Sequence, residues 1–187
     1  MLNNITPILE SIHGAKAKCG ATLLITIDGP AGSGKTVLAQ EISDALSTLG
    51  QISTTIHMDS LYDGWENALT SSLTTMLRKR VLPALQEGKD FSLPYFDWLI
   101  GSYGPEENYQ AAPITILEGV GASQRVTRQY SSVIVWIEAP LEIALERVLQ
   151  RDGYDLEGPL KGFKKAELVH FSEEASKAAS HHILHSA

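Results

Sequence analysis

Cysteine is almost absent from this sequence: Cys19 is the only one among 187 residues. A single cysteine excludes an internal disulfide framework and a four-cysteine zinc site, and it is typical of a reducing compartment. No apolar run approaches the ~18 residues that a membrane helix requires. The first residues also do not pair a basic stretch with a long apolar one, as a secretory signal would. We therefore expect a cytoplasmic protein with no membrane partner.

Positive charge is also scarce, because 15 Lys and Arg stand against 22 Asp and Glu, which gives a formal net charge of −7. Nucleic acid is bound largely through neutralisation of its phosphates, so it is not an expected partner. The chain has no internal repeat and no low-complexity tract. Its length predicts a single domain over residues 1–187.

Short apolar runs rich in β-branched residues recur along the chain, each nearly continuous rather than alternating. This pattern is typical of strands buried on both faces of a parallel sheet. The predicted strands are 22–27, 52–56, 114–117, 133–137 and, more weakly, 182–185. The segments with helical spacing between and after them are 37–49, 141–150 and 164–179. The alternation predicts a three-layer α/β sandwich, a five-stranded and mostly parallel sheet with helices on both faces.

Three segments lie outside this alternation. Residues 1–20 predict an amphipathic leader helix, which we expect to pack against the domain. Residues 58–112 hold two of the three tryptophans and four of the six tyrosines. An aromatic-rich insertion at the carboxyl end of a sheet predicts a ligand pocket. Residues 152–163 predict a mobile lid with a turn at Gly158-Pro159.

The segment from Gly29 to Thr36 follows the first predicted strand and opens the next predicted helix. It matches Gly-x4-Gly-Lys-[Ser/Thr], the pattern of a phosphate-binding loop, in the context that the pattern needs. Glycines let such a loop turn its N–H groups toward phosphate oxygens, and the helix N-terminus adds the positive end of its dipole. We expect ATP or GTP, with Lys35 on the β- and γ-phosphates and the Thr36 hydroxyl on Mg²⁺. The predicted nucleotide-binding residues are Gly29, Pro30, Ala31, Gly32, Ser33, Gly34, Lys35 and Thr36.

Further short motifs narrow the class. No Asn-Lys-x-Asp motif is present to read guanine. The segments 57–62 (HMDSLY), 94–98 (PYFDW) and 117–119 (LEG) follow the loop in this order. Together with the loop they resemble the uridine kinase-like family of P-loop nucleoside and small-metabolite kinases, from about residue 22 to 152. The resemblance implies a P-loop kinase-like fold and transfer of the γ-phosphoryl of Mg-ATP to a hydroxyl of a small-molecule acceptor.

The resemblance assigns two carboxylates to the chemistry. Asp59 matches the family's aspartate that accepts the proton of the acceptor hydroxyl, a role for which a strand-end carboxylate is suited. The alternative is a helix cap, since Asp-Ser pairs commonly cap helices. Glu118 is expected to end a strand beside the loop strand and to join Thr36 at Mg²⁺. A solvated carboxylate is the alternative there.

Arg147 and Arg151 match the entrance of the family's lid. They are four residues apart and therefore share one helix face, from which both could contact the phosphates. The alternative is surface pairing with Glu142, Glu146 or Asp155. Arg151 is the last arginine of the chain, whereas uridine kinases continue with further lid arginines; here only lysines follow.

The acceptor segment also departs from the family. Uridine kinases carry a His and an Arg after Tyr-Asp-Phe, but this chain has Leu-Ile-Gly-Ser-Tyr at 99–103. Uridine as the acceptor therefore does not follow, and we expect a nucleoside or another small metabolite, pantothenate-like and sugar-acid molecules included. The alternative is a nucleotide-binding regulator or weak ATPase without an acceptor. The predicted acceptor-binding residues are Tyr62, Trp65, Phe96, Asp97 and Trp98. Core packing is the alternative for the four aromatic residues, and we expect it for at least two.

The histidines carry less information. His57 is expected to pack beneath the site. Three histidines near the end of the sequence, at 181, 182 and 185, lack neighbouring cysteines or paired carboxylates. We expect them to be strand and surface residues rather than metal ligands.

Overall fold

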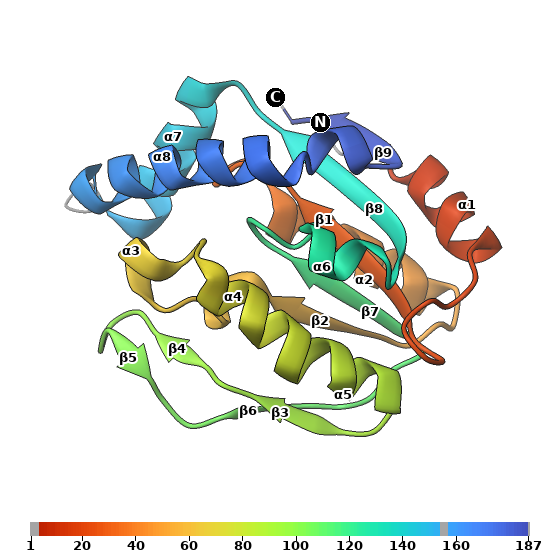
Figure 1. The fold of residues 1–187 in the computed structure, drawn as a ribbon. Coiled ribbons are helices and arrows are strands. Elements are labelled where there is room, and N and C mark those ends of the chain that lie inside the picture. Colours follow the sequence, from red (N-terminus) through yellow and green to blue (C-terminus); the bar gives the residue numbers. More distant parts are fainter. Residues whose placement is uncertain (1–3, 154–156, 187) are drawn as a thin grey trace.

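Five parallel strands form the centre of the protein, in a computed structural model that describes residues 4–153 and 157–186. They lie in the order β2-β7-β1-β8-β9 (Figure 1). Every neighbouring pair is parallel. The strands are β1 (Leu23–Asp28), β2 (Ser53–His57), β7 (Ile114–Glu118), β8 (Ser131–Glu138) and β9 (His182–His185). The predicted five-stranded α/β sandwich is confirmed.

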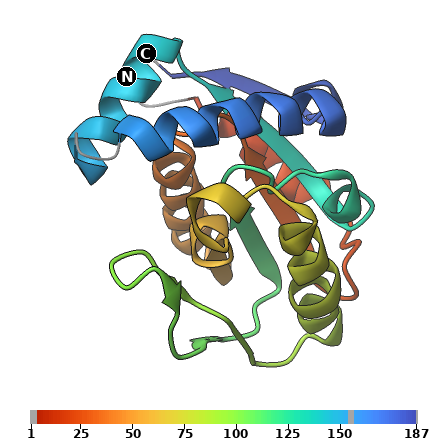
Figure 2. The ribbon, with the colours of Figure 1, turned by 60° about the vertical axis from the view of Figure 1, so that its left-hand side comes forward.

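The strands carry apolar side chains on both sides because helices cover both faces of the sheet. On one face lie α1 (Thr6–Gly14) and α2 (Lys35–Thr48), whose buried side chains share a core cluster with Ile25 and Ile27 of β1. Because side chains alternate along a strand, Leu24 points to the opposite face. There it packs with α4 (Ser71–Met76) and the neighbouring helical segments η2 (Leu77–Val81) and α5 (Leu82–Glu87). Figures 1 and 2 show these two helical layers.

A long insertion, residues 58–112, lies between β2 and β7. It begins with η1 (Met58–Ser60) and α3 (Gly64–Asn67). After α5 the chain forms two short antiparallel pairs, β3 with β6 and β4 with β5. Their bounds are β3 (Phe91–Leu93), β4 (Phe96–Asp97), β5 (Ser102–Tyr103) and β6 (Glu107–Tyr109). The insertion therefore places β4 against η1, directly after the carboxyl end of β2.

The carboxyl-terminal third returns to the sheet through helices. A short turn of helix, α6 (Arg125–Arg128), follows β7, and α7 (Leu141–Asp152) follows β8. The long helix α8 (Glu157–Glu174) then precedes β9, with a 3₁₀ turn at Lys177–Ala179 between them. None of the described helices is long and apolar enough to cross a membrane.

One prediction about local structure is wrong. The expected turn at Gly158-Pro159 belongs to the first turn of α8, where a proline is tolerated because its missing N–H needs no helical partner. Helix is favoured there because Leu160 and Phe163 become buried. The rest of the predicted lid, residues 154–156, lies outside the described residues. The leader helix is confirmed but shorter than expected, with Ile8 and Ile12 buried in the core.

Candidate active site

The phosphate-binding loop connects β1 to α2 and touches two other elements. Gly29 and Gly32 have φ angles of +145° and +83°. A Cβ atom on Gly29 would lie 2.0 Å from the carbonyl oxygen of Ile137 in β8, and one on Gly32 would lie 2.0 Å from that of Ala144 in α7. The loop glycines are therefore required both by their backbone angles and by this close packing.

Lys35 is the first residue of α2 and is buried beneath the loop. Its Nζ atom donates to the carbonyl oxygen of Pro30 at 2.9 Å. Burial lowers the pKa of Lys35, while the carboxylates of Glu118 and Asp59 act in the opposite direction. The ammonium group therefore lies within electrostatic reach of the predicted catalytic carboxylate, Asp59, and of the predicted Mg²⁺ ligand, Glu118.

The loop also contains an unsatisfied polar atom. The hydroxyl oxygen of Ser33 is buried and has no hydrogen-bond partner among the described residues. Buried polar atoms are nearly always paired, so an unpaired hydroxyl inside such a loop fits an anionic ligand that accepts its hydrogen bond. Together with the glycine backbone and Lys35, this atom makes the loop suitable for nucleotide phosphates.

Asp28, the last residue of β1, binds the turn that follows β7, a role that the sequence did not indicate. This carboxylate is fully buried and accepts hydrogen bonds from the backbone N–H groups of Gly29, Gly121 and Ser123 at 2.8–2.9 Å. Burial raises the pKa of Asp28, and these three bonds and the charge of Lys35 oppose the shift. Asp28 thereby joins the start of the phosphate-binding loop to the turn after β7.

Glu118 ends β7 next to the loop strand, as predicted, and lies in register with Ile27 of β1. The Thr36 hydroxyl donates to its Oε1 atom at 3.1 Å. The two predicted Mg²⁺ ligands are therefore in contact. Both offer oxygen atoms, which Mg²⁺ prefers, so the residues present fit this ion.

His57 does not pack beneath the site as expected. It ends β2, its side chain is 46% exposed, and its Nδ1 atom lies 2.6 Å from Glu118 Oε1. A carboxylate only accepts, so the imidazole donates. This hydrogen bond raises the pKa of His57.

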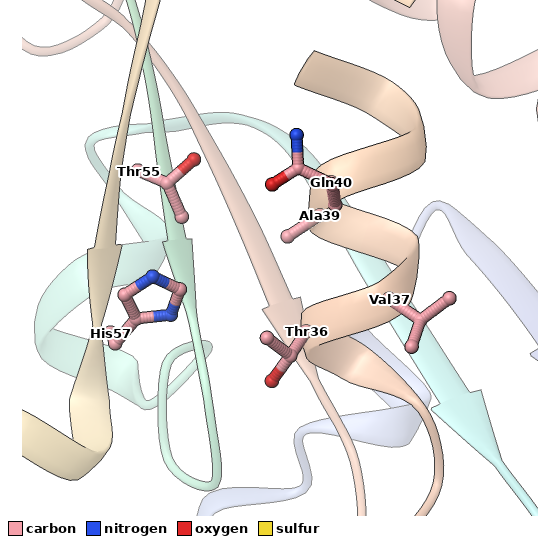
Figure 3. A pocket seen from close by; sticks show the side chains of 6 residues that line it. All are labelled: Thr36, Val37, Ala39, Gln40, Thr55 and His57. Atoms are coloured by element: carbon pink, nitrogen blue, oxygen red, sulfur yellow. The ribbon is translucent and has the colours of Figure 1, made fainter. Parts of the chain in front are cut away.

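A cavity of about 280 Å³ opens beside His57, between α2 and β2 (Figure 3). It is lined by Thr36, Val37, Ala39, Gln40, Thr55 and His57.

Asp59 lies in η1, directly after β2, and keeps access to solvent. Desolvation by the surrounding protein atoms and the nearby carboxylate of Glu118 raise the pKa of Asp59. The positive charges of Lys35, Arg151 and His57 lower it. No hydrogen bond of an Asp59 side-chain oxygen to a backbone N–H is found among the described residues, as a helix cap would make. The carboxylate therefore lies within electrostatic reach of Lys35, Glu118 and Arg151.

The two predicted arginines differ in their contacts. Arg147 Nη1 donates to the Gly32 carbonyl oxygen at 3.4 Å and to Ser186 Oγ at 3.0 Å, so it touches the phosphate-binding loop. Arg151 forms two hydrogen bonds with the neighbouring Asp152, at 2.6 and 2.7 Å. This partner raises the pKa of Arg151, and the charges of Asp59 and Glu118 add to the effect. Arg151 is therefore near the site but held by a surface carboxylate.

The predicted aromatic residues form one cluster beside Asp59. The ring of Trp98 lies 5.0 Å from that of Trp65 and 5.1 Å from that of Phe96. The indole N–H of Trp98 donates to the Asp59 carbonyl oxygen at 3.0 Å. Phe163 of α8, which the sequence analysis did not select, lies 5.8 Å from Trp65. The cluster is therefore shared between the insertion and α8.

Only part of this cluster is open to a ligand. Tyr62 and Phe96 are 2% and 4% exposed, and the Tyr62 hydroxyl donates to the Val120 carbonyl oxygen. These two residues are core, as the alternative reading allowed for at least two. Trp98 is 36% exposed. Asp97 Oδ1 accepts from the N–H groups of Leu99 and Ile100, which gives this carboxylate a structural role in the β4–β5 turn that the sequence analysis did not anticipate.

The late histidines make ordinary contacts. His182 hydrogen-bonds to Ser11, and His185 pairs with Glu138 at 3.2 Å. Across the part of the chain that the structure describes, no group of three or more His, Cys, Asp or Glu side chains is arranged to hold a metal. A cation at Thr36 and Glu118 would thus depend on further ligands from a bound phosphate.

Two solved structures have the same fold. One is described as a possible uridine kinase from Bacillus stearothermophilus, with a TM-score of 0.73, 19% identity and 96% of each chain covered. The other is a putative fructose transport system kinase from Silicibacter, with a TM-score of 0.62, 18% identity, and 96% of this chain and 95% of that chain covered.

A curated relative shares part of the sequence. The inorganic pyrophosphatase TTM2 of Arabidopsis thaliana is 27% identical over 150 residues, which cover 78% of this chain. The chain spans only 22% of the length of that protein.

The parallel sheet, the loop between β1 and α2 and the likeness to these two structures define a P-loop domain with a kinase-like α/β fold. The sequence profile of the AAA domain family matches residues 25–169, which is more than half of the chain. The chain belongs to this family.

Proposed function

We propose that this protein is an ATP-dependent kinase that transfers the γ-phosphoryl group of Mg-ATP to a hydroxyl of a nucleoside or another small metabolite. The observation that carries the proposal is the convergence of three groups at the end of the sheet. The Thr36 hydroxyl donates to Glu118 Oε1 at 3.1 Å, and the carboxylates of Glu118 and Asp59 both support the positive charge of the Lys35 ammonium group. One cation and two carboxylates beside a phosphate-binding loop match the needs of phosphoryl transfer.

Each residue has a defined task in this proposal. The N–H of Ala31 is donated to Glu167, so Lys35 and the other loop amides bind the β- and γ-phosphates. Thr36 and Glu118 hold the metal ion. Bound Mg-ATP supplies the phosphoryl group and a cation that neutralises its oxygens. Asp59 accepts the proton of the acceptor hydroxyl, for which its exposed position directly after β2 is suited.

Arginines and aromatic side chains complete the site. Arg147 already touches the loop at Gly32. Arg151 reaches the phosphates once it leaves Asp152, which requires a local rearrangement of exposed side chains. The exposed part of Trp98 and the neighbouring Trp65, whose rings are tilted by 60° to one another, provide an apolar surface for the acceptor.

The proposal is tested by ADP formation from Mg-ATP, with and without a panel of nucleosides, sugar acids and pantothenate-like alcohols. Turnover that depends on one acceptor supports the kinase. Slow turnover that no acceptor changes contradicts it and supports a weak ATPase or nucleotide-binding regulator. Inorganic pyrophosphate belongs in the panel as well. Its hydrolysis without an acceptor would support the activity in the name of the Arabidopsis relative and contradict our proposal.

A further inference from the structure

Two side chains of helix α8 bind the backbone N–H and the backbone carbonyl group of Ala31 in the phosphate-binding loop. Glu167 Oε1 accepts a hydrogen bond from the N–H of Ala31 at 2.7 Å. Lys164 Nζ donates to the carbonyl oxygen of the same Ala31 at 2.8 Å. The two side chains also pair with each other at 3.1 Å, one helical turn apart. The backbone polar groups of Ala31 are thus both bound by a helix that lies more than 130 residues further along the chain.

This pair is unusually well shielded from water. The side chains of Lys164 and Glu167 are 13% and 3% exposed. Removing two charges from water costs free energy, and a buried pair is weak evidence for a role in stability. Leu160 and Phe163, on the same face of α8, supply apolar packing instead. Because the pair binds the backbone of Ala31, we look for its role in what the phosphate-binding loop binds.

The ammonium group of Lys164 has an unused donor. It has three N–H bonds, of which Ala31 and Glu167 take two, and the described residues provide no third partner. Lys35 donates to the carbonyl oxygen of Pro30, the residue before Ala31. Two lysines are thus bound to consecutive carbonyl groups of one loop. Glu167 also belongs to the carboxylates that support the positive charge of Lys35.

We propose that Lys164 is a second phosphate-binding lysine, which α8 supplies to the β- and γ-phosphates of a bound nucleotide, and that Glu167 is a positioning residue that holds it against the loop. The inference rests on the proposed function, because it requires a nucleotide in the loop. It gives a role to a lysine in the region after Arg151 where the sequence has no arginine. Lysine serves there as a point charge rather than as a bidentate fork.

Equilibrium binding of ATP, measured without an acceptor, tests this inference. We expect Lys164→Met to weaken ATP binding by about 10- to 100-fold, because a charge-assisted hydrogen bond is lost. Lys164→Arg should retain most of the affinity. Lys165→Met is the matched control, since Lys165 is the next residue on α8 and is exposed. That variant should bind ATP as the parent does.

A double variant separates direct contact from charge balance. Lys164→Met alone leaves the buried Glu167 unpaired, which could unfold the chain or repel the phosphates. Lys164→Met/Glu167→Gln removes both charges, and thermal melting shows whether it is folded. If the double variant still binds ATP at least tenfold more weakly than Glu167→Gln alone, Lys164 contacts the phosphates. If the two bind equally, Lys164 only neutralises Glu167 and the inference is overturned.

The same measurement distinguishes this inference from the proposed function. Loss of ATP binding in Lys35→Ala, with unchanged binding in both Lys164→Met and the double variant, would overturn the role of Lys164 alone. A parent chain that binds no nucleotide would overturn both proposals.

Discussion

His57 and Glu118 face each other on neighbouring parallel strands and are joined by a hydrogen bond of 2.6 Å. The Thr36 hydroxyl donates to the same carboxylate oxygen, Oε1. Two donors on one oxygen fix the orientation of the carboxylate and leave Oε2 for other ligands. In the proposed function, this makes His57 a positioning residue for the carboxylate that serves Mg²⁺.

We therefore predict that His57→Ala raises the Mg²⁺ concentration needed for tight ATP binding by about tenfold, a usual effect of losing a partner of a metal ligand. ATP binding without Mg²⁺ should not change. Titration of Mg²⁺ at fixed ATP measures this, and His13→Ala, at an exposed position on α1, is the control. An unaltered Mg²⁺ requirement in His57→Ala would show that the hydrogen bond is only structural.

The second prediction concerns the phosphates. Lys35→Ala should lose most catalysis and bind ATP more weakly, because a charge-assisted contact disappears from a buried site. ADP should be affected less than ATP, since the γ-phosphate contact is missing from it. Calorimetric titration with both nucleotides measures the difference. Equal activity of this variant and the parent would exclude the loop from catalysis.

The aromatic cluster gives a third prediction. Trp98→Ala should raise the KM for the acceptor by about 2- to 10-fold, the equivalent of an aromatic contact, with little effect on ATP binding. Tyr62→Phe is the matched comparison, because its hydroxyl is buried against Val120. It should lower the free energy of unfolding by about 1 kcal/mol and leave the KM unchanged. Loss of stability without a kinetic effect in Trp98→Ala would place Trp98 in the core.

Cys19 should be a slow nucleophile. The thiol is buried, and burial raises its pKa to about 11. At pH 8 the native protein should therefore react slowly with a thiol reagent and rapidly in urea, because only the thiolate is reactive. The unfolded chain releases the thiol proton near pH 9, whereas the native state keeps it until about pH 11. The free energy of unfolding should therefore fall as the pH rises from about 9 to about 11. Fast labelling of the folded chain at pH 8 would contradict the burial of this residue.

Much of the site could be predicted because it follows from local sequence and parallel strands. The loop pattern lies between a strand and a helix, and Glu118 ends a strand beside β1 as expected. Asp59 follows β2, whose neighbour in the sheet is β7, so both carboxylates reach the same edge. These positions need only the order of strands and the spacing of motifs.

The remaining features depend on contacts between distant segments. The bonds of Lys164 and Glu167 to Ala31 join residues more than 130 positions apart, and no local pattern specifies them. One signal was available: Glu167 lies four positions after Phe163 on the buried face of α8, where a carboxylate needs a partner. The role of Asp97 as a turn acceptor could not be separated from a binding role by sequence, because both use the same side chain.

The most direct test of the proposed chemistry is kcat for the Asp59→Asn variant, with the acceptor that the panel identifies. Asparagine keeps the size of the side chain but cannot accept the proton. We predict that kcat falls by about 10²–10⁴-fold while ATP affinity and melting temperature stay close to those of the parent. Rescue by extra Mg²⁺ would instead make Asp59 a metal ligand. An unchanged kcat would remove Asp59 from the mechanism and contradict the account.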